Sequence, residues 1–180
     1  MTRIKDWMDE FRNAPASEGL GIARTLVLSA VVGMVAGLGA VLLVSLLQLS
    51  QWFFLGCLAN YTPTTPAGEP EMFRHLPAFG GEVRRWAFLL LPAVGGLGAS
   101  VIVLKSAPEA EGHGTDAAIE AYHFRGGKVR PVVPPVKAVA TALVIGTGGS
   151  AGCEGPITQI GSGFGSAVAS MLGLPVRARR

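Results

Sequence analysis

The chain has 180 residues, of which 49% are hydrophobic and only 15% are charged. Soluble domains usually carry about 25% charged residues, so this composition argues against an ordinary soluble protein. The net charge of +3 does not indicate a nucleic-acid partner, because the basic residues form no cluster interleaved with aromatic side chains. Two cysteines are too few for a disulfide framework or a cysteine-based zinc site, and we expect no metal and no cofactor.

Residues 1–24 form a mixed-charge segment with Trp7, Met8 and Phe11 at helical spacing. The segment lacks the apolar core and cleavage site of a secretory signal, so we expect it to stay on the protein. Both an amphipathic helix at the membrane surface and a disordered tail fit this pattern. We therefore divide the chain into a cytoplasmic N-terminal segment, 1–24, and a membrane domain, 25–180.

The first predicted membrane segment begins at residue 25, because no charge occurs from there to position 68. A helix over Leu26–Leu58 would be about 50 Å long, whereas the hydrocarbon core of a bilayer is about 30 Å thick. We expect this helix to tilt or to extend beyond the bilayer. A face for a neighbouring helix is predicted at Gly33, Gly37 and Gly39. An interfacial aromatic belt is predicted at Trp52, Phe53, Phe54 and Tyr61.

A proline-containing loop, 62–85, precedes the second predicted span, Trp86–Leu104. Pro92 and the glycines that follow it predict a kink with close packing. Lys and Arg are more frequent before the first span and after the second than in the loop between them. This distribution places the N-terminus in the cytoplasm and the loop outside.

Residues 106–130 carry too many charges to cross a membrane as one helix. A glycine turn followed by a short helix is predicted here, from about Thr115 to His123, with Thr115 or Asp116 as its N-cap. The breaker Pro131–Pro135 then precedes an apolar segment, Val136–Ile145, which contains a buried-looking Lys137. The last apolar helix is predicted over Pro156–Leu172.

Glu154 is the only charged residue between Ala138 and Val176. A buried carboxylate is costly unless it is paired, hydrogen-bonded or protonated. Gly155 and Pro156 predict a helix start, whose free amides and dipole favour an anion. The carboxylate of Glu154 would lie at the entrance of that anion site and could occupy it in place of an anion. This arrangement predicts a gate.

Two other interpretations of this stretch remain open. Gly146–Ala151 fits the dinucleotide pattern G-x-G-x-x-A, but no acidic residue follows at the required distance. Alternatively, Glu154 only caps a helix at the membrane surface.

Three motifs in register resemble the CLC family of chloride channels and proton-coupled chloride exchangers. Gly152-Cys153-Glu154-Gly155-Pro156, followed by Gln159-Ile160-Gly161, is similar to that family's G-R-E-G-P-x-x-Q-I-G. Pro108–Gly114 resembles its P-E-A-x-G-S-G, and Pro135-Val136-Lys137 resembles its P-V-K. The resemblance runs from about Arg24 to the end of the chain.

The resemblance implies an all-α polytopic membrane protein, the partial first repeat of an inverted-repeat fold with broken helices. It makes Glu154 the gating glutamate, which also carries the proton in exchangers. The resemblance also implies an anion-binding site. Its residues are the turn Gly112, His113 and Gly114, the side chain of Lys137, and the helix start Gly152, Cys153, Gly155 and Pro156. The implied partners are chloride or a similar anion, protons, membrane lipid and a second copy in a homodimer. The implied location is a bacterial-type plasma (inner) membrane.

The sequence departs from the family pattern at three places. His113 replaces a serine, which exchanges a hydroxyl donor for an imidazole that contacts the anion or turns away from it. Thr115-Asp116 replaces Ile-Pro, and Asp116 would repel an anion unless it points aside. Cys153 replaces an arginine, which removes a positive charge near the gate.

The predicted function is anion transport by a channel or an exchanger, without enzymatic chemistry. The resemblance covers less than half of the family's membrane domain, so we expect this chain to be an N-terminal piece that does not conduct alone. The alternative is a structural helical membrane subunit in which Glu154 and Lys137 pair inside the bundle. The residues do not distinguish a channel from an exchanger.

Overall fold

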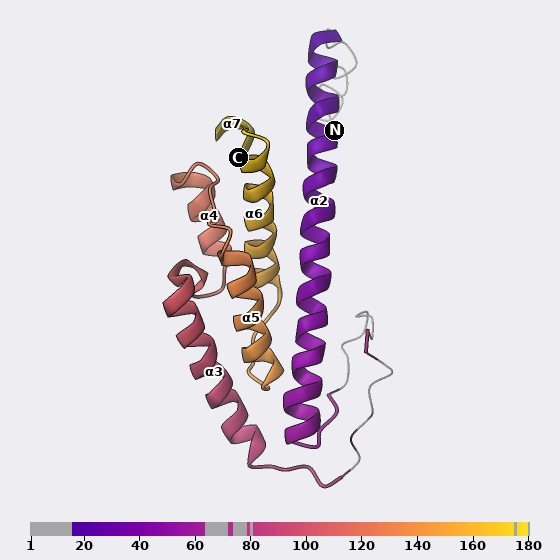
Figure 1. The fold of residues 1–180 in the computed structure, drawn as a ribbon, viewed down its shortest axis with the longest axis vertical. Helices are drawn as coiled ribbons and strands as arrows, with labels where there is room; N and C mark the ends of the chain where they lie inside the picture. The colour runs from indigo at the N-terminus through magenta and orange to yellow at the C-terminus, as the bar shows by residue number, and fades with distance from the viewer. Residues whose placement is uncertain (1–15, 64–71, 74–78, 80, 175, 180) are drawn as a thin grey trace, which may run out of the picture. The chain divides into compact units, whose positions relative to one another are not determined.

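The structure is a computed structural model that describes residues 16–63, 72–73, 79, 81–174 and 176–179 (Figure 1). Every regular element in these ranges is helical. The predictions for Trp7, Met8 and Phe11 lie outside the described residues, as does most of the 62–85 loop. The chain forms two compact units, Met1–Met34 and Val35–Arg180, and the site described below belongs to the second.

The first apolar segment is the helix α2, Ala16–Gln51, which continues as the π-helix η1, Trp52–Leu58. Its portion Leu26–Leu58 is long and apolar enough to cross a membrane, as predicted. Residues 16–24 belong to the same helix, so the boundary predicted at residue 24 is not a break in secondary structure. Of the predicted glycine face, Gly39 contacts Phe164, whereas Gly37 has open space beside it.

The second apolar segment is α3, Ala87–Ser106, which is also long and apolar enough to span a membrane. Large side chains on one side of α3 are exposed, including Leu89 at 79% and Leu97 at 70%. Gly95 lies directly against the side chain of Thr147, which confirms the predicted close packing at this glycine.

The remaining helices are shorter. They are η2, Pro108–Ala110, a 3-10 turn; α4, Thr115–Phe124; α5, Val133–Gly146; α6, Glu154–Met171; and α7, Val176–Arg179. With 10 and 14 residues, α4 and α5 measure about 15 Å and 21 Å, less than the ~30 Å hydrocarbon core.

The prediction that Pro131–Pro135 separates two segments was wrong at its C-terminal end. Helix α5 begins at Val133, so Pro134 and Pro135 lie in its first turn. Proline is tolerated there because the amides of the first turn have no partner within the helix.

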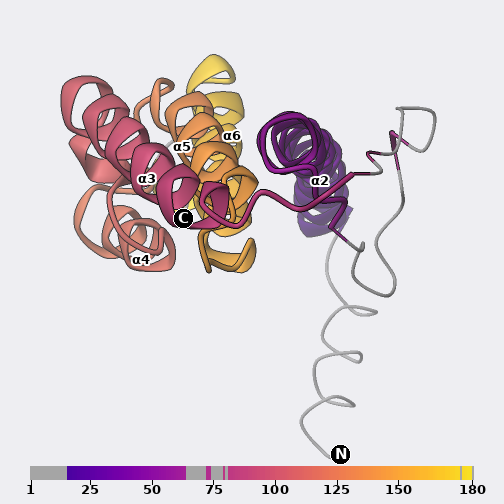
Figure 2. The ribbon, with the colours of Figure 1, turned by 90° about the horizontal axis from the view of Figure 1, so that it is seen from below.

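Helix α5 packs between α3 and α6 (Figure 2). Helix α4 packs on α6. One core cluster joins α3, η2 and α5 through small and β-branched residues such as Ala99, Val103, Val133 and Val136. A second cluster joins the C-terminal half of α2 to α5 and α6 through Leu43, Leu47, Ala142 and Ile160. This packing holds the starts of α4 and α6 in fixed positions.

Candidate functional site

A glycine turn leads from η2 into α4. Gly112 and Gly114 have φ values of +74° and +103°, a region that glycine adopts without a steric penalty. Gly114 is the N-cap of α4, and no side chain caps the helix. The prediction of Thr115 or Asp116 as the N-cap was therefore wrong. Without a side-chain cap, the first amides of α4 remain open to another acceptor.

The start of α6 lies against this turn. A Cβ on Gly155 would collide with the carbonyl oxygen and the ring of His113. A Cβ on Gly114 would lie 2.8 Å from the carbonyl oxygen of Gly155 and 2.9 Å from Oε1 of Gln159. Two motifs far apart in the sequence thus meet through their glycines, and any larger residue at these positions would separate them.

Gln159 ties α6 to η2. Its side chain is 2% exposed, and Nε2 donates a hydrogen bond of 2.8 Å to the carbonyl oxygen of Glu109. The Oε1 atom is buried without a hydrogen-bond partner among the described residues. Gln159, from the motif at the start of α6, therefore holds that motif against the Pro108–Gly114 motif, beside Gly114.

Lys137 reaches the same turn from α5. It is 5% exposed, and Nζ donates to the carbonyl oxygens of Ala110 at 3.0 Å and Gly112 at 2.6 Å. Among the described residues it forms no ion pair with Glu154, so the buried Glu–Lys pair of the structural-subunit interpretation is not formed. Lys137 shapes the turn and brings a positive charge to it.

A cavity of about 590 Å³ is lined by the glycine turn, by Lys137 and by the start of α6. Five of the nine predicted site residues line it: Gly112, His113, Lys137, Gly152 and Pro156. Ser100, Thr141 and Ser150 also line it, and they were not predicted. Thr141 follows Lys137 by one helical turn, a spacing that could have identified it, whereas nothing in the sequence places Ser100 here.

Glu154 stands beside the cavity as the first residue of α6. Its side chain is exposed, and Oε2 folds back against Gly152, which lines the cavity. The first helical bond of α6 is donated by Ile157 to the carbonyl oxygen of Cys153, so the amides of Glu154 and Gly155 precede it. A negative charge is favoured at such a helix start.

A family model described as voltage gated chloride channel matches residues 95–180. The match includes all three motifs and both helix starts. Residues 95–180 belong to this CLC family. No curated protein and no solved structure matches the chain. CLC family membership and the two long apolar helices make this an integral membrane protein with a polytopic helical fold.

The remaining predicted site residues of the CLC-like motifs border the cavity. Gly114 and Gly155 form the contact described above, and Cys153 is the half-buried N-cap of α6. The ring of His113 is exposed, with Nδ1 3.1 Å from Oγ1 of Thr115.

The exposed carboxylate of Glu111 also lines the cavity. Within the described part of the chain, no three His, Cys, Asp or Glu side chains are grouped to hold a metal ion.

Proposed function

We propose that the cavity beside Lys137 binds chloride or a similar anion during transport. One observation carries the proposal: the glycine turn that leads into the uncapped helix α4, the start of α6 and Lys137 line a single cavity. Helix starts supply unpaired amides and a positive dipole end, which replace the water around an anion. Lys137 adds a positive charge whose hydrogen bonds go to carbonyl oxygens, and among the described residues it forms no ion pair with a carboxylate.

In this proposal Glu154 is the gate. As a carboxylate it competes with the anion for the amides at the start of α6, and as a neutral acid it leaves them. Its exposure supports such a movement, because among the described residues no hydrogen bond or ion pair holds its carboxylate. In an exchanger, the same protonation would couple anion movement to proton movement.

Anion efflux and proton uptake, measured together in liposomes across external pH, test the gate in the complete protein. Glu154→Gln imitates the neutral acid and Glu154→Ala empties the position, so both variants should make anion flux less dependent on pH. In an exchanger both should also uncouple the proton. Glu82→Gln, at an exposed residue outside the cavity, is the matched control. Wild-type pH dependence in both Glu154 variants would refute the gate.

By family resemblance we also expect a homodimer in a bacterial-type plasma membrane with a cytoplasmic N-terminus. The competing function, a structural subunit held by a Glu154–Lys137 pair, loses its support because the pair is absent among the described residues. Chloride should therefore raise the thermal stability of the complete protein, which a purely structural subunit would not show.

A further inference from the structure

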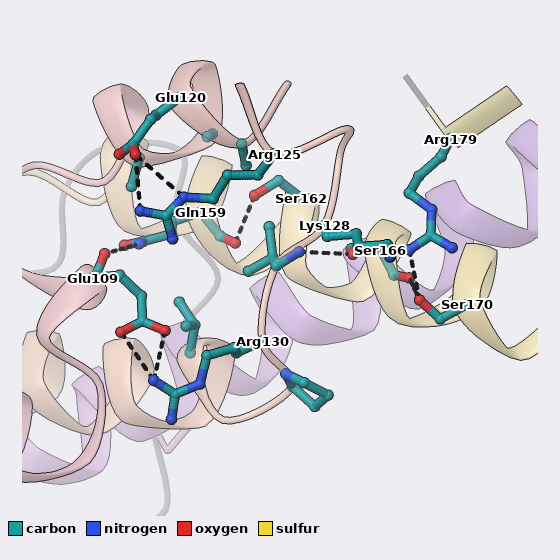
Figure 3. A pocket seen from close by; sticks show the side chains of 16 residues that line it. Glu109, Glu120, Arg125, Lys128, Arg130, Gln159, Ser162, Ser166, Ser170 and Arg179 are labelled. Atoms are coloured by element: carbon teal, nitrogen blue, oxygen red, sulfur yellow. Dashed lines mark hydrogen bonds and ion pairs between the residues drawn. The ribbon is translucent and has the colours of Figure 1, made fainter. Parts of the chain in front are cut away.

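A second cavity, of about 630 Å³, shares no lining residue with the proposed anion site. It lies between α4, α6, α7 and the 125–131 connection (Figure 3). Four cations and two carboxylates line it, which gives a net charge of +2. A polar cavity with an excess of cations is suited to an anionic ligand.

The two carboxylates are already paired. Arg125 donates to Glu120 at 2.8 Å, and Arg130 pairs with Glu109 at 3.0 Å (Figure 3). The excess charge therefore belongs to Lys128 and Arg179, for which the described residues supply no carboxylate. These are the two cations free to meet a ligand.

The guanidinium of Arg179 makes a hydrogen bond through one nitrogen and lacks one at another. One terminal nitrogen donates to Oγ of Ser170 at 2.8 Å, whereas Nε is buried without a hydrogen-bond partner among the described residues. A buried unpaired donor is costly, so it indicates a missing acceptor. An anionic oxygen in the cavity would satisfy this nitrogen.

Serines extend the polar wall along α6, at helical spacing. Ser166 is 4% exposed, and its hydroxyl accepts a hydrogen bond of 2.9 Å from the amide of Val129, which fixes the loop that carries Lys128. Charged donors thus approach the cavity from the loop that carries Lys128 on one side and from Arg179 of α7 on the other. A tetrahedral oxyanion can accept hydrogen bonds from several directions, and the planar guanidinium of arginine matches its oxygens.

We propose that this second cavity binds a phosphate group, with Lys128 and Arg179 as its charged donors. The phosphate belongs to a lipid headgroup or to a soluble phosphate compound, and the chemistry of recognition is the same for both. The site is separate from the chloride pathway, so its failure would leave the proposed transport function untouched.

Calorimetric titration of the full chain in detergent tests the soluble source, with inorganic phosphate, chloride and acetate compared at equal ionic strength. Thermal unfolding in nanodiscs of phosphatidylcholine, with and without phosphatidic acid, tests the lipid source. We expect phosphate to bind more tightly than chloride or acetate, or phosphatidic acid to stabilise the protein, and either result supports the site.

Lys128→Gln and Arg179→Gln should each weaken that binding about tenfold, equivalent to ~1.4 kcal/mol. Lys105→Gln, an exposed cation at the end of α3 that lines neither cavity, should leave it unchanged. Circular dichroism checks that the helices remain. The proposal is overturned if neither arm shows phosphate-specific binding, or if Lys105→Gln weakens it as much as the cavity variants. Acetate binding as tightly as phosphate would also overturn it, in favour of a carboxylate-bearing peptide.

Discussion

Replacing Lys137 by methionine tests the central contact of the anion site. Methionine retains the apolar stem and removes both hydrogen bonds to the turn, at 3.0 and 2.6 Å. Hydrogen bonds to charged groups contribute about 1.5–3 kcal/mol each, and the two carbonyl groups left behind lose their donor. Removing a buried charge also relieves its desolvation, which offsets part of this loss. We therefore expect Lys137→Met to lower the free energy of unfolding by about 2–4 kcal/mol.

Equilibrium unfolding in mixed detergent, with and without chloride, measures both parts of this prediction. Lys105→Met is the matched control, because Lys105 is exposed at the end of α3 and its loss should cost at most about 0.5–1 kcal/mol. Stabilisation by chloride should also decrease in Lys137→Met and persist in the control. Equal destabilisation by the two substitutions, with equal chloride dependence, would show that Lys137 neither supports the turn nor attracts the anion.

Three further substitutions address the same turn. Gly114→Ala should destabilise the protein by about 2–4 kcal/mol, because φ is +103° and α6 leaves no room for a Cβ; Gly96→Ala, in open space within α3, should show no loss in the same unfolding assay. Gln159→Leu should cost about 1–2 kcal/mol through the lost bond to η2 and weaken chloride binding in calorimetry; unchanged values for both would mean that the tether is dispensable. His113→Ser in the complete protein should change chloride affinity, because His113 lines the cavity, and an unchanged affinity in calorimetry would show that the ring does not contact the anion.

The extents of the helices were largely predictable from local composition. The two long apolar segments correspond to α2 with η1 and to α3. The short helix predicted after the glycine turn, within the charged 106–130 stretch, corresponds to α4. The errors occurred at helix starts, where two local options compete. Thr115 and Asp116 are good N-cap residues by type, but the contact with Gly155 requires a positive φ at Gly114, which makes that glycine the cap.

The partners of polar side chains were less predictable. Sequence alone allowed Lys137 to pair with Glu154, whereas Nζ donates to carbonyl oxygens of a turn more than twenty positions earlier in the chain. Backbone acceptors have no residue-type signature, so no pattern in the sequence indicates them. The second cavity was missed for a related reason: serines at helical spacing are visible in the sequence, but the loop and the arginine that complete it come from other elements.

The shortness of α4 and α5 has a consequence for how the chain is made. Helices such as α3 can leave the translocon singly, because each satisfies its own backbone and is apolar enough for lipid. A helix of 14 residues that ends in a glycine loop within the bilayer would expose carbonyls and amides to hydrocarbon, at a cost of several kcal/mol per group. We therefore expect α4 and α5 to enter the membrane together with α6, with α5 packed on α3. Insertion and tertiary folding of this part of the protein would then be a single event, completed only after the ribosome has synthesised α6.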